Sequence, residues 1–77
     1  MSRYFFHTEN GGSFTDTEGV ELPSLMVARN EAIAAASEML SDLSGALAEG
    51  GNWRMDVQDE AGSLCMSIVI FIDGDRL

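Results

Sequence analysis

The stretch Leu64–Ile72 is the most hydrophobic part of the chain, with Ser67 as its single polar residue. Its length, its β-branched residues and the turn residues on either side predict a strand rather than a helix. A strand with one solvated face alternates apolar and polar residues, and this stretch does not. We therefore expect both faces of this strand to be covered. Since the rest of the chain predicts one helix, the second cover is expected to come from a partner.

Three other segments show strand patterns. Arg3–Glu9 is rich in aromatic residues, and a turn at Asn10–Gly12 leads into a short return strand over Ser13–Asp16. The segment Trp53–Gln58 alternates apolar and polar residues, which predicts a strand with one buried face. Residues Val20–Pro23 are expected to form an extended lead-in to the helix, because the residue before a proline avoids helical backbone angles.

Between the two strand pairs, apolar residues recur every three or four positions, which predicts one amphipathic helix over Ser24–Leu47. Ser24 suits the N-cap position, and the glycines at Gly50–Gly51 are expected to end the helix. The residues expected to pack on the sheet are Leu25, Ala32, Ala36, Met39 and Leu43. Three further apolar residues at seven-residue spacing widen this stripe: Met26, Ile33 and Leu40.

The order of these elements predicts a single α+β domain over residues 1–77. We expect a two-layer ββαββ sandwich, in which one long helix packs on one face of a four-stranded sheet. The most apolar strands, Arg3–Glu9 and Leu64–Ile72, are expected in the centre. The shorter or more polar strands, Ser13–Asp16 and Trp53–Gln58, are expected at the edges, and the helix would bring them parallel to each other.

The sheet face away from the helix is expected to form a homodimer interface. Alternation along the strands assigns five residues to this face, with Arg3 beside them: Phe5, His7, Cys65, Val69 and Phe71. The opposite parity is assigned to the helix side: Tyr4, Phe6, Met55, Val57, Met66, Ile68 and Ile70. A contiguous exposed apolar patch is unusual on a monomer and is typical of an interface. Small domains without a disulfide or a metal often gain stability from a partner subunit.

The charge of the chain argues against several classes of partner. It contains 13 acidic residues against four arginines and no lysine, which gives a net charge of −9. Such a charge repels phosphate backbones and anionic membrane surfaces, so we expect neither nucleic-acid nor membrane binding. The longest apolar run is also far shorter than the about 20 residues of a membrane-spanning helix. A single cysteine within a strand and the absence of a recognisable targeting signal predict a cytoplasmic location.

The sequence predicts no catalytic site, no cofactor site and no metal site. His7 is the single histidine, and it is expected to be a hydrogen-bonded strand residue because no nucleophile motif accompanies it. Cys65 lies within the apolar strand and is expected to be inert. Four acidic residues near the first hairpin carry the oxygen ligands that Ca²⁺ and Mg²⁺ prefer: Glu9, Asp16, Glu18 and Glu21. Without a calcium-loop pattern they are interpreted as a solvated acidic rim, with cation binding left open.

Short motifs in a fixed order suggest a family. They comprise the Arg-Tyr-Phe-Phe-His run at Arg3–His7, the segment Asp16–Pro23, an alanine-rich helix with Arg29 and Glu31-Ala32, and Val57–Gly62 before the apolar strand. Together they resemble a family of short alphaproteobacterial proteins classed as a domain of unknown function, which begins with an RYFFH-like strand. The resemblance covers nearly the whole chain and implies no activity.

In outline the chain is also similar to HicB-type antitoxins, which combine a β-hairpin, a Leu-Pro-like turn and an Ala/Glu-rich helix. The hairpin at Tyr4–Phe14, Leu22-Pro23 and the helix from Ser24 match this outline, whereas the glycine pattern after the proline differs. A shared β-β-α core is an analogy of fold and implies little about function.

These observations favour a non-enzymatic α+β module that dimerises and mediates protein–protein interaction. One alternative is an antitoxin-like or regulatory subunit that neutralises a basic protein partner through its acidic surface. A second alternative, a small metal-dependent enzyme, is disfavoured because the sequence assembles no paired acid, base and nucleophile.

Overall fold

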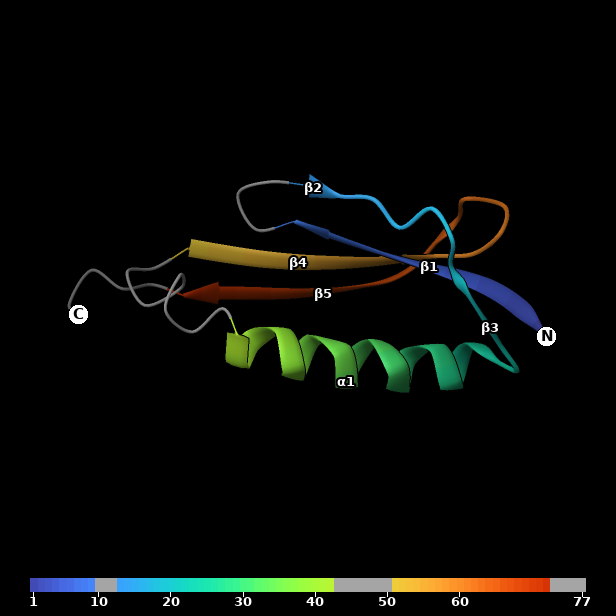
Figure 1. Ribbon diagram of the computed structural model, residues 1–77, viewed down its shortest axis with the longest axis horizontal. Coiled ribbons are helices and arrows are strands. Elements are labelled where there is room, and N and C mark those ends of the chain that lie inside the picture. The colour runs from blue at the N-terminus through green and yellow to red at the C-terminus, as the bar shows by residue number, and fades with distance from the viewer. Residues whose placement is uncertain (10–12, 43–50, 73–77) are drawn as a thin grey trace.

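One helix and five strands follow one another along the described part of the chain. The computed structural model describes residues 1–9, 13–42 and 51–72. The elements are β1 (Ser2–Glu9), β2 (Ser13–Phe14), β3 (Val20–Leu22), α1 (Leu25–Asp42), β4 (Gly51–Gln58) and β5 (Leu64–Ile72). The helix lies along one side of the antiparallel sheet (Figure 1), so the predicted α+β sandwich with ββαββ order is confirmed.

The sheet has one strand more than predicted, because the segment before the helix also pairs. In β3, Val20 lies opposite Tyr4 and Leu22 lies opposite Ser2, at the start of β1. In β2, Phe14 lies opposite Thr8, near the end of β1. Two very short strands therefore share the same edge of β1.

The predicted strand order is wrong, because β4 and not β5 lies in the centre of the sheet. The order is β2-β1-β4-β5, with β3 also paired to β1. β4 pairs antiparallel with β1, where Val57 lies opposite Phe6, and it does not run beside β2. On its other side β4 pairs antiparallel with β5, where Met55 lies opposite Ile68. Among the described strands β5 pairs with β4 alone, so the most hydrophobic strand is an edge strand.

The alternating pattern of β4 explains its central position. Its inward side chains are the largest fully buried side chains of the described residues: Trp53, Met55 and Val57. Its outward polar side chains find partners on both neighbouring strands, since Gln58 contacts His7 of β1 and Asp56 accepts a hydrogen bond from Ser67 of β5. An edge position would offer these polar groups one neighbouring strand instead of two. Apolar content alone is therefore a poor guide to strand order in this sheet.

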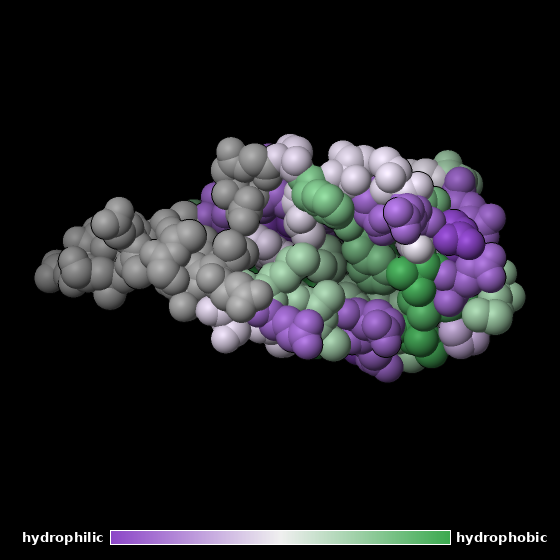
Figure 2. Space-filling view, viewed as in Figure 1, coloured by the Kyte–Doolittle hydropathy of each residue, from purple (hydrophilic) through white to green (hydrophobic). Residues whose placement is uncertain are grey.

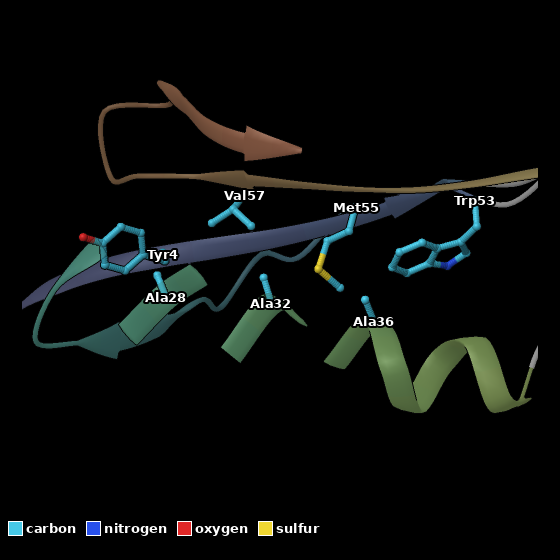
Figure 3. Packing of buried hydrophobic residues seen from close by; sticks show 7 residues of the cluster. All are labelled: Tyr4, Ala28, Ala32, Ala36, Trp53, Met55 and Val57. Carbon is cyan, nitrogen blue, oxygen red and sulfur yellow. The ribbon is translucent and has the colours of Figure 1, made fainter. Parts of the chain in front are cut away.

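Helix α1 approaches the sheet closely because the residues that it turns toward the strands are alanines. Figure 3 shows the strand side chains pointing at the helix, and one cluster joins the two layers: Tyr4, Ala28, Ala32, Ala36, Trp53, Met55 and Val57. In the view of Figure 2, hydrophobic residues lie between more hydrophilic ones along the line where sheet and helix meet. The core is thus narrow and depends on the small size of the helical side chains.

The start of the helix agrees with the sequence, but part of the predicted stripe does not. The backbone N–H of Val27 donates to Ser24 Oγ at 3.2 Å, which confirms the N-cap. Leu25 and Met39, predicted to pack on the sheet, are exposed instead, because the three buried alanines already occupy the contact. The predicted Leu43 contact and the helix end at Gly50 lie outside the described residues.

The strands divide their residues between the two sheet faces as predicted, with one exception. All seven residues assigned to the helix side belong to the core cluster or pack against it. A register shift between Val57 and Gln58 leaves Cys65 as an extra residue in β5, where it packs against the core instead of lying on the open face. The shift brings Leu64 opposite Gln58, on the open face. The assignment of Cys65 to the open face is therefore wrong.

Candidate functional site

His7 lies on the open face of β1 with both ring nitrogens engaged. The backbone N–H of Asp16 donates to Nδ1 at 3.0 Å, so Nδ1 acts as the acceptor. The proton is then on Nε2, which donates to Gln58 Oε1 at 3.3 Å. The ring also stacks on Phe5, with 6.5 Å between the ring centroids. This arrangement holds the β1 surface to the loop before β3, and neither nitrogen is free to act as a general base.

A second polar group lies beside His7, on β4 and β5. Asp56 Oδ1 accepts hydrogen bonds from Ser67 Oγ and from Arg54 Nε, both at 2.7 Å. The hydrogen bond from Ser67 and that from Arg54 together lower the pKa of Asp56 below its usual value. The Ser67 hydroxyl donates to Asp56 and not to His7, so these residues do not form a nucleophile–base pair. The group joins the exposed surfaces of two strands.

The loop between β2 and β3 is organised by Asp16. Its Oδ1 accepts hydrogen bonds from the backbone N–H groups of Glu18 and Gly19, and its Oδ2 accepts one from Phe6 at 3.2 Å. Burial alone would raise the pKa of Asp16, but the hydrogen bonds from Gly19, Phe6 and Glu18 outweigh it and lower the pKa. Gly19 completes the loop with a φ of +70°, and a Cβ there would lie 2.8 Å from Arg3 Cγ.

The acidic residues of the first hairpin do not surround a common point. The carboxylate of Asp16 accepts hydrogen bonds from backbone N–H groups, whereas Oε1 of Glu21 lies 3.3 Å from the guanidinium of Arg3. The Arg3 guanidinium also donates to the carbonyl oxygen of Glu18, and its backbone N–H donates to Glu60 Oε1. Within the described segments no group of three acidic, histidine or cysteine side chains is arranged to hold a metal ion.

The predicted dimer patch on the open face is divided by β4. Phe5 and His7 lie on β1, whereas Val69 and Phe71 lie on β5, opposite Arg54 and Asn52 of the intervening strand. Charged and amide side chains thus separate the two halves of the predicted patch. Val69 and Phe71 are 58% and 71% exposed, and they belong to the edge of the sheet rather than to a continuous open face. The dimer itself stays a prediction, but the patch predicted for it is not contiguous.

The outer edge of β5 is an apolar edge of the sheet that no other described strand covers. The strand is nine residues long and contains no charged residue. After the bulge at Cys65 the register with β4 is regular from Met66 to Ile72. Edge strands present unpaired backbone N–H and C=O groups, to which another strand can add.

Two apolar hollows continue this surface between β5 and α1. The first, of about 390 Å³, is lined at one end of the helix by Leu25, Met26, Arg29, Cys65 and Met66. The second, of about 220 Å³, is lined further along by Ile33, Ala36, Ser37, Leu40, Ile68 and Ile70. Met26, Ile33 and Leu40 are all exposed here. The sequence contained the signal for this surface: apolar residues every seven positions made the stripe wider than one sheet contact requires.

The comparisons with known proteins identify a family but no activity. A family model with the description "Domain of unknown function (DUF6894)" matches residues 3–71. The searches of curated proteins and of solved structures found no match. In the segments that the structure describes, no helix combines the length and the hydrophobicity needed to cross a membrane.

Proposed function

The chain belongs to the family described as Domain of unknown function (DUF6894), and because this description gives no activity, we propose a function from the geometry. The proposed function is a non-enzymatic protein-interaction module that binds an extended strand along the β5 edge. The observation that carries the proposal is the contrast between the two edges of the sheet.

One edge of the sheet has the features that prevent strand addition. It is divided into β2 with two residues and β3 with three residues, and β3 contains Glu21 and is followed by Pro23. Short strands, charges and prolines are the usual protection of sheet edges. The β5 edge has none of these between Met66 and Ile72. This difference supports β5 as a strand-docking edge of the kind used in β-augmentation.

The polar groups of the open face support a non-enzymatic role. His7 and Asp16 each hold a loop or a strand in place through hydrogen bonds, and Asp56 joins β4 to β5. Each of these groups is therefore explained by a structural contact. We further propose a cytoplasmic location, which the free thiol of Cys65 supports.

A strand peptide tests the docking edge directly. The probe is a synthetic peptide with the sequence Leu64–Ile72 and two lysines at each end for solubility. Titrated into isotope-labelled protein, it is expected to shift the amide signals of β5 and of the adjacent side of α1. A lysine on an edge strand opposes pairing, so Val69→Lys is expected to weaken peptide binding by about tenfold or more.

Phe14→Lys is the matched control, because Phe14 is also an exposed apolar residue and lies on the opposite edge of the sheet. This variant is expected to bind the peptide like the wild type. Amide shifts that map to β2 and β3, or no binding by the monomeric protein up to about millimolar peptide, the limit of weak association, would contradict the proposed function.

A second candidate function is the binding of a basic protein, as in an antitoxin-like or regulatory subunit. It is supported by exposed acidic residues on and near the protected edge: Glu18, Glu21, Glu31 and Glu60. A lysine-rich peptide would then shift the amides of this edge, and the shifts would disappear at high salt. No shift at low salt would remove this candidate.

A further inference from the structure

We propose that the occupant of the β5 edge is a second copy of this chain, related by a two-fold axis perpendicular to the sheet near Ile68 and passing beside Ile33. This inference rests on the proposed function and adds the identity of the partner and its register. In the resulting dimer, β5 pairs antiparallel with its copy, and the two helices lie antiparallel on the same face of a continuous sheet.

Leu25 is exposed beside the start of β5. Five further exposed helix residues on this side form a symmetric set, which is the first support and is here called the α1 seam: Met26, Arg29, Ile33, Ser37 and Leu40. Their spacings of three, four, four and three residues read the same in both directions, with Ile33 in the middle. In an antiparallel pair of helices, Ile33 therefore meets Ile33, Met26 meets Leu40, and Arg29 meets Ser37. A two-fold interface requires this kind of self-complementary pattern.

The second support is that the helix and the strand share one centre. The two elements run in the same direction beside each other (Figure 1). Met26 lies with Cys65 and Met66 at one end, whereas Leu40 lies with Ile70 toward the other. From Met26 to Leu40 the helix rises by about 21 Å with Ile33 at its middle, and the regular strand steps from Met66 to Ile70, with Ile68 at their middle, span about 13 Å. Because Ile33 and Ile68 line the same hollow, one axis can serve both elements.

The third support is the distribution of charge. Two copies with a net charge of −9 each repel one another, so an interface between them needs a surface without acidic residues. Glu31 lies on the opposite side of the helix, where it lines a hollow with Val20 and Leu22. Glu38 follows Glu31 by seven residues and shares that side. The described part of the α1 seam and of β5 thus carries no acid, which suits a second copy better than a basic partner.

The shapes of the two hollows fit the same arrangement. Leu40 of one copy comes opposite Met26 of the other, above the larger hollow beside Met66. The hollow is apolar apart from the Arg29 side chain, and the two-fold axis repeats the contact at the other end of the interface. Burial of exposed apolar side chains is the main favourable contribution to such an association.

The oligomeric state tests the partner, with variants that leave the core untouched. Sedimentation equilibrium of the wild type is expected to show a dimer at a protein concentration of about 100 micromolar, which is at the upper end of ordinary dimer dissociation constants. Ile33→Glu is expected to raise the dissociation constant at least about tenfold, because it places two acids against each other at the axis. Ala34→Glu adds the same charge at the neighbouring exposed position and is expected to change the dissociation constant by less than about twofold.

Crosslinking tests the register. In a Cys65→Ser background, Ile33→Cys is expected to form a covalent dimer with a short bis-maleimide. Met26→Cys and Leu40→Cys are expected to crosslink only when the two variants are mixed. Glu38→Cys, on the other side of the helix, is the control that should not crosslink.

The outcomes distinguish failure of the proposed dimer from failure of the proposed strand-docking function. A wild type that stays monomeric overturns the second copy, and binding of the strand peptide by that monomer would leave the proposed function intact. Failure of both experiments removes both conclusions. A dimer that crosslinks through Phe71→Cys and not through Ile33→Cys would show association through the open face and would also overturn the proposal.

Discussion

At the scale of single residues, Gly19 has no room for an added methyl group. Its φ is +70°, and an added Cβ would lie 2.8 Å from Arg3 Cγ and 2.9 Å from the carbonyl oxygen of Tyr4. We expect Gly19→Ala to lower the free energy of unfolding by about 2–4 kcal/mol, from the left-handed backbone and the displaced neighbours together. Urea denaturation measures this loss.

Gly62 provides the matched control for this prediction. Its φ of +82° imposes the same kind of backbone cost, but nothing lies within 4 Å of an added Cβ. Gly62→Ala is therefore expected to lower the free energy of unfolding by only about 1–2 kcal/mol. Equal losses at the two glycines would mean that the contacts of Gly19 with β1 do not matter.

Asp16 makes the stability of the same loop depend on pH. Burial raises its pKa, but the backbone hydrogen bonds from Gly19, Phe6 and Glu18 lower the pKa by more. A carboxyl group with a depressed pKa in the folded state contributes stability above its unfolded pKa, and this contribution is lost as the pH falls through the folded value. The difference in unfolding free energy between wild type and Asp16→Asn is therefore expected to be largest above about pH 4 and to shrink below it. Urea titrations over this range measure the difference, and a gap of constant size would contradict the assignment.

At the scale of elements, the separation of helix and sheet is set by the alanines of α1. Ala32 is fully buried against the strands, whereas Ala34 is exposed on the same helix. Ala32→Leu is expected to lower the free energy of unfolding by about 1–3 kcal/mol, because the added carbons must push the helix and the sheet apart. Ala34→Leu should change the unfolding free energy by less than about 0.5 kcal/mol, the usual limit for a surface position. Thermal or urea unfolding of both variants checks the contrast, and a stabilised Ala32→Leu would mean that the core is underpacked.

The alternation of residues predicted most of this architecture. The apolar run and its flanking turn residues indicated the boundaries of β5, and the serine before the helical pattern indicated the Ser24 cap. Alternation identified the buried face of β4 and the strand residues that face the helix. Alternation did not predict the strand order. The hydrophobicity of a strand indicates how much of its surface must be buried, but not whether another element of this chain or a partner buries it. The bulge at Cys65 also escaped prediction, since an extra residue in one strand is visible only against its partner strand.

The candidate site was predictable only in part. The sequence indicated that Leu64–Ile72 lacks a cover, and the structure shows where that cover is lacking: along the outer edge of the strand as well as on one face. The predicted open-face patch failed to be contiguous because β4 inserts Arg54 and Asp56 between its two halves. Parity assigns faces to residues, but the neighbours on a face depend on the strand order, which is a property of the whole sheet.

At the scale of the whole molecule, the net charge of −9 opposes any association between copies. A dimer held by ion pairs would weaken as salt screens its attractions. A dimer held by the acid-free surface of β5 and the α1 seam responds in the opposite direction, because salt screens only the repulsion between the two acidic bodies. The sign of the salt dependence therefore reports which part of the surface forms the contact.

We expect the dissociation constant of the dimer to fall by about threefold or more when sodium chloride is raised from about 20 to about 500 millimolar, over which the screening length shortens from about 20 Å to less than 5 Å. Sedimentation equilibrium across this range measures the change. Arg54→Ala serves as a control, because Arg54 lies on the open face of β4 in an ion pair with Asp56 and does not reach the α1 seam. Its dimer should show the same sign of salt dependence. A dissociation constant that rises with salt would show that ion pairs hold the copies together, which would exclude the acid-free edge as the interface.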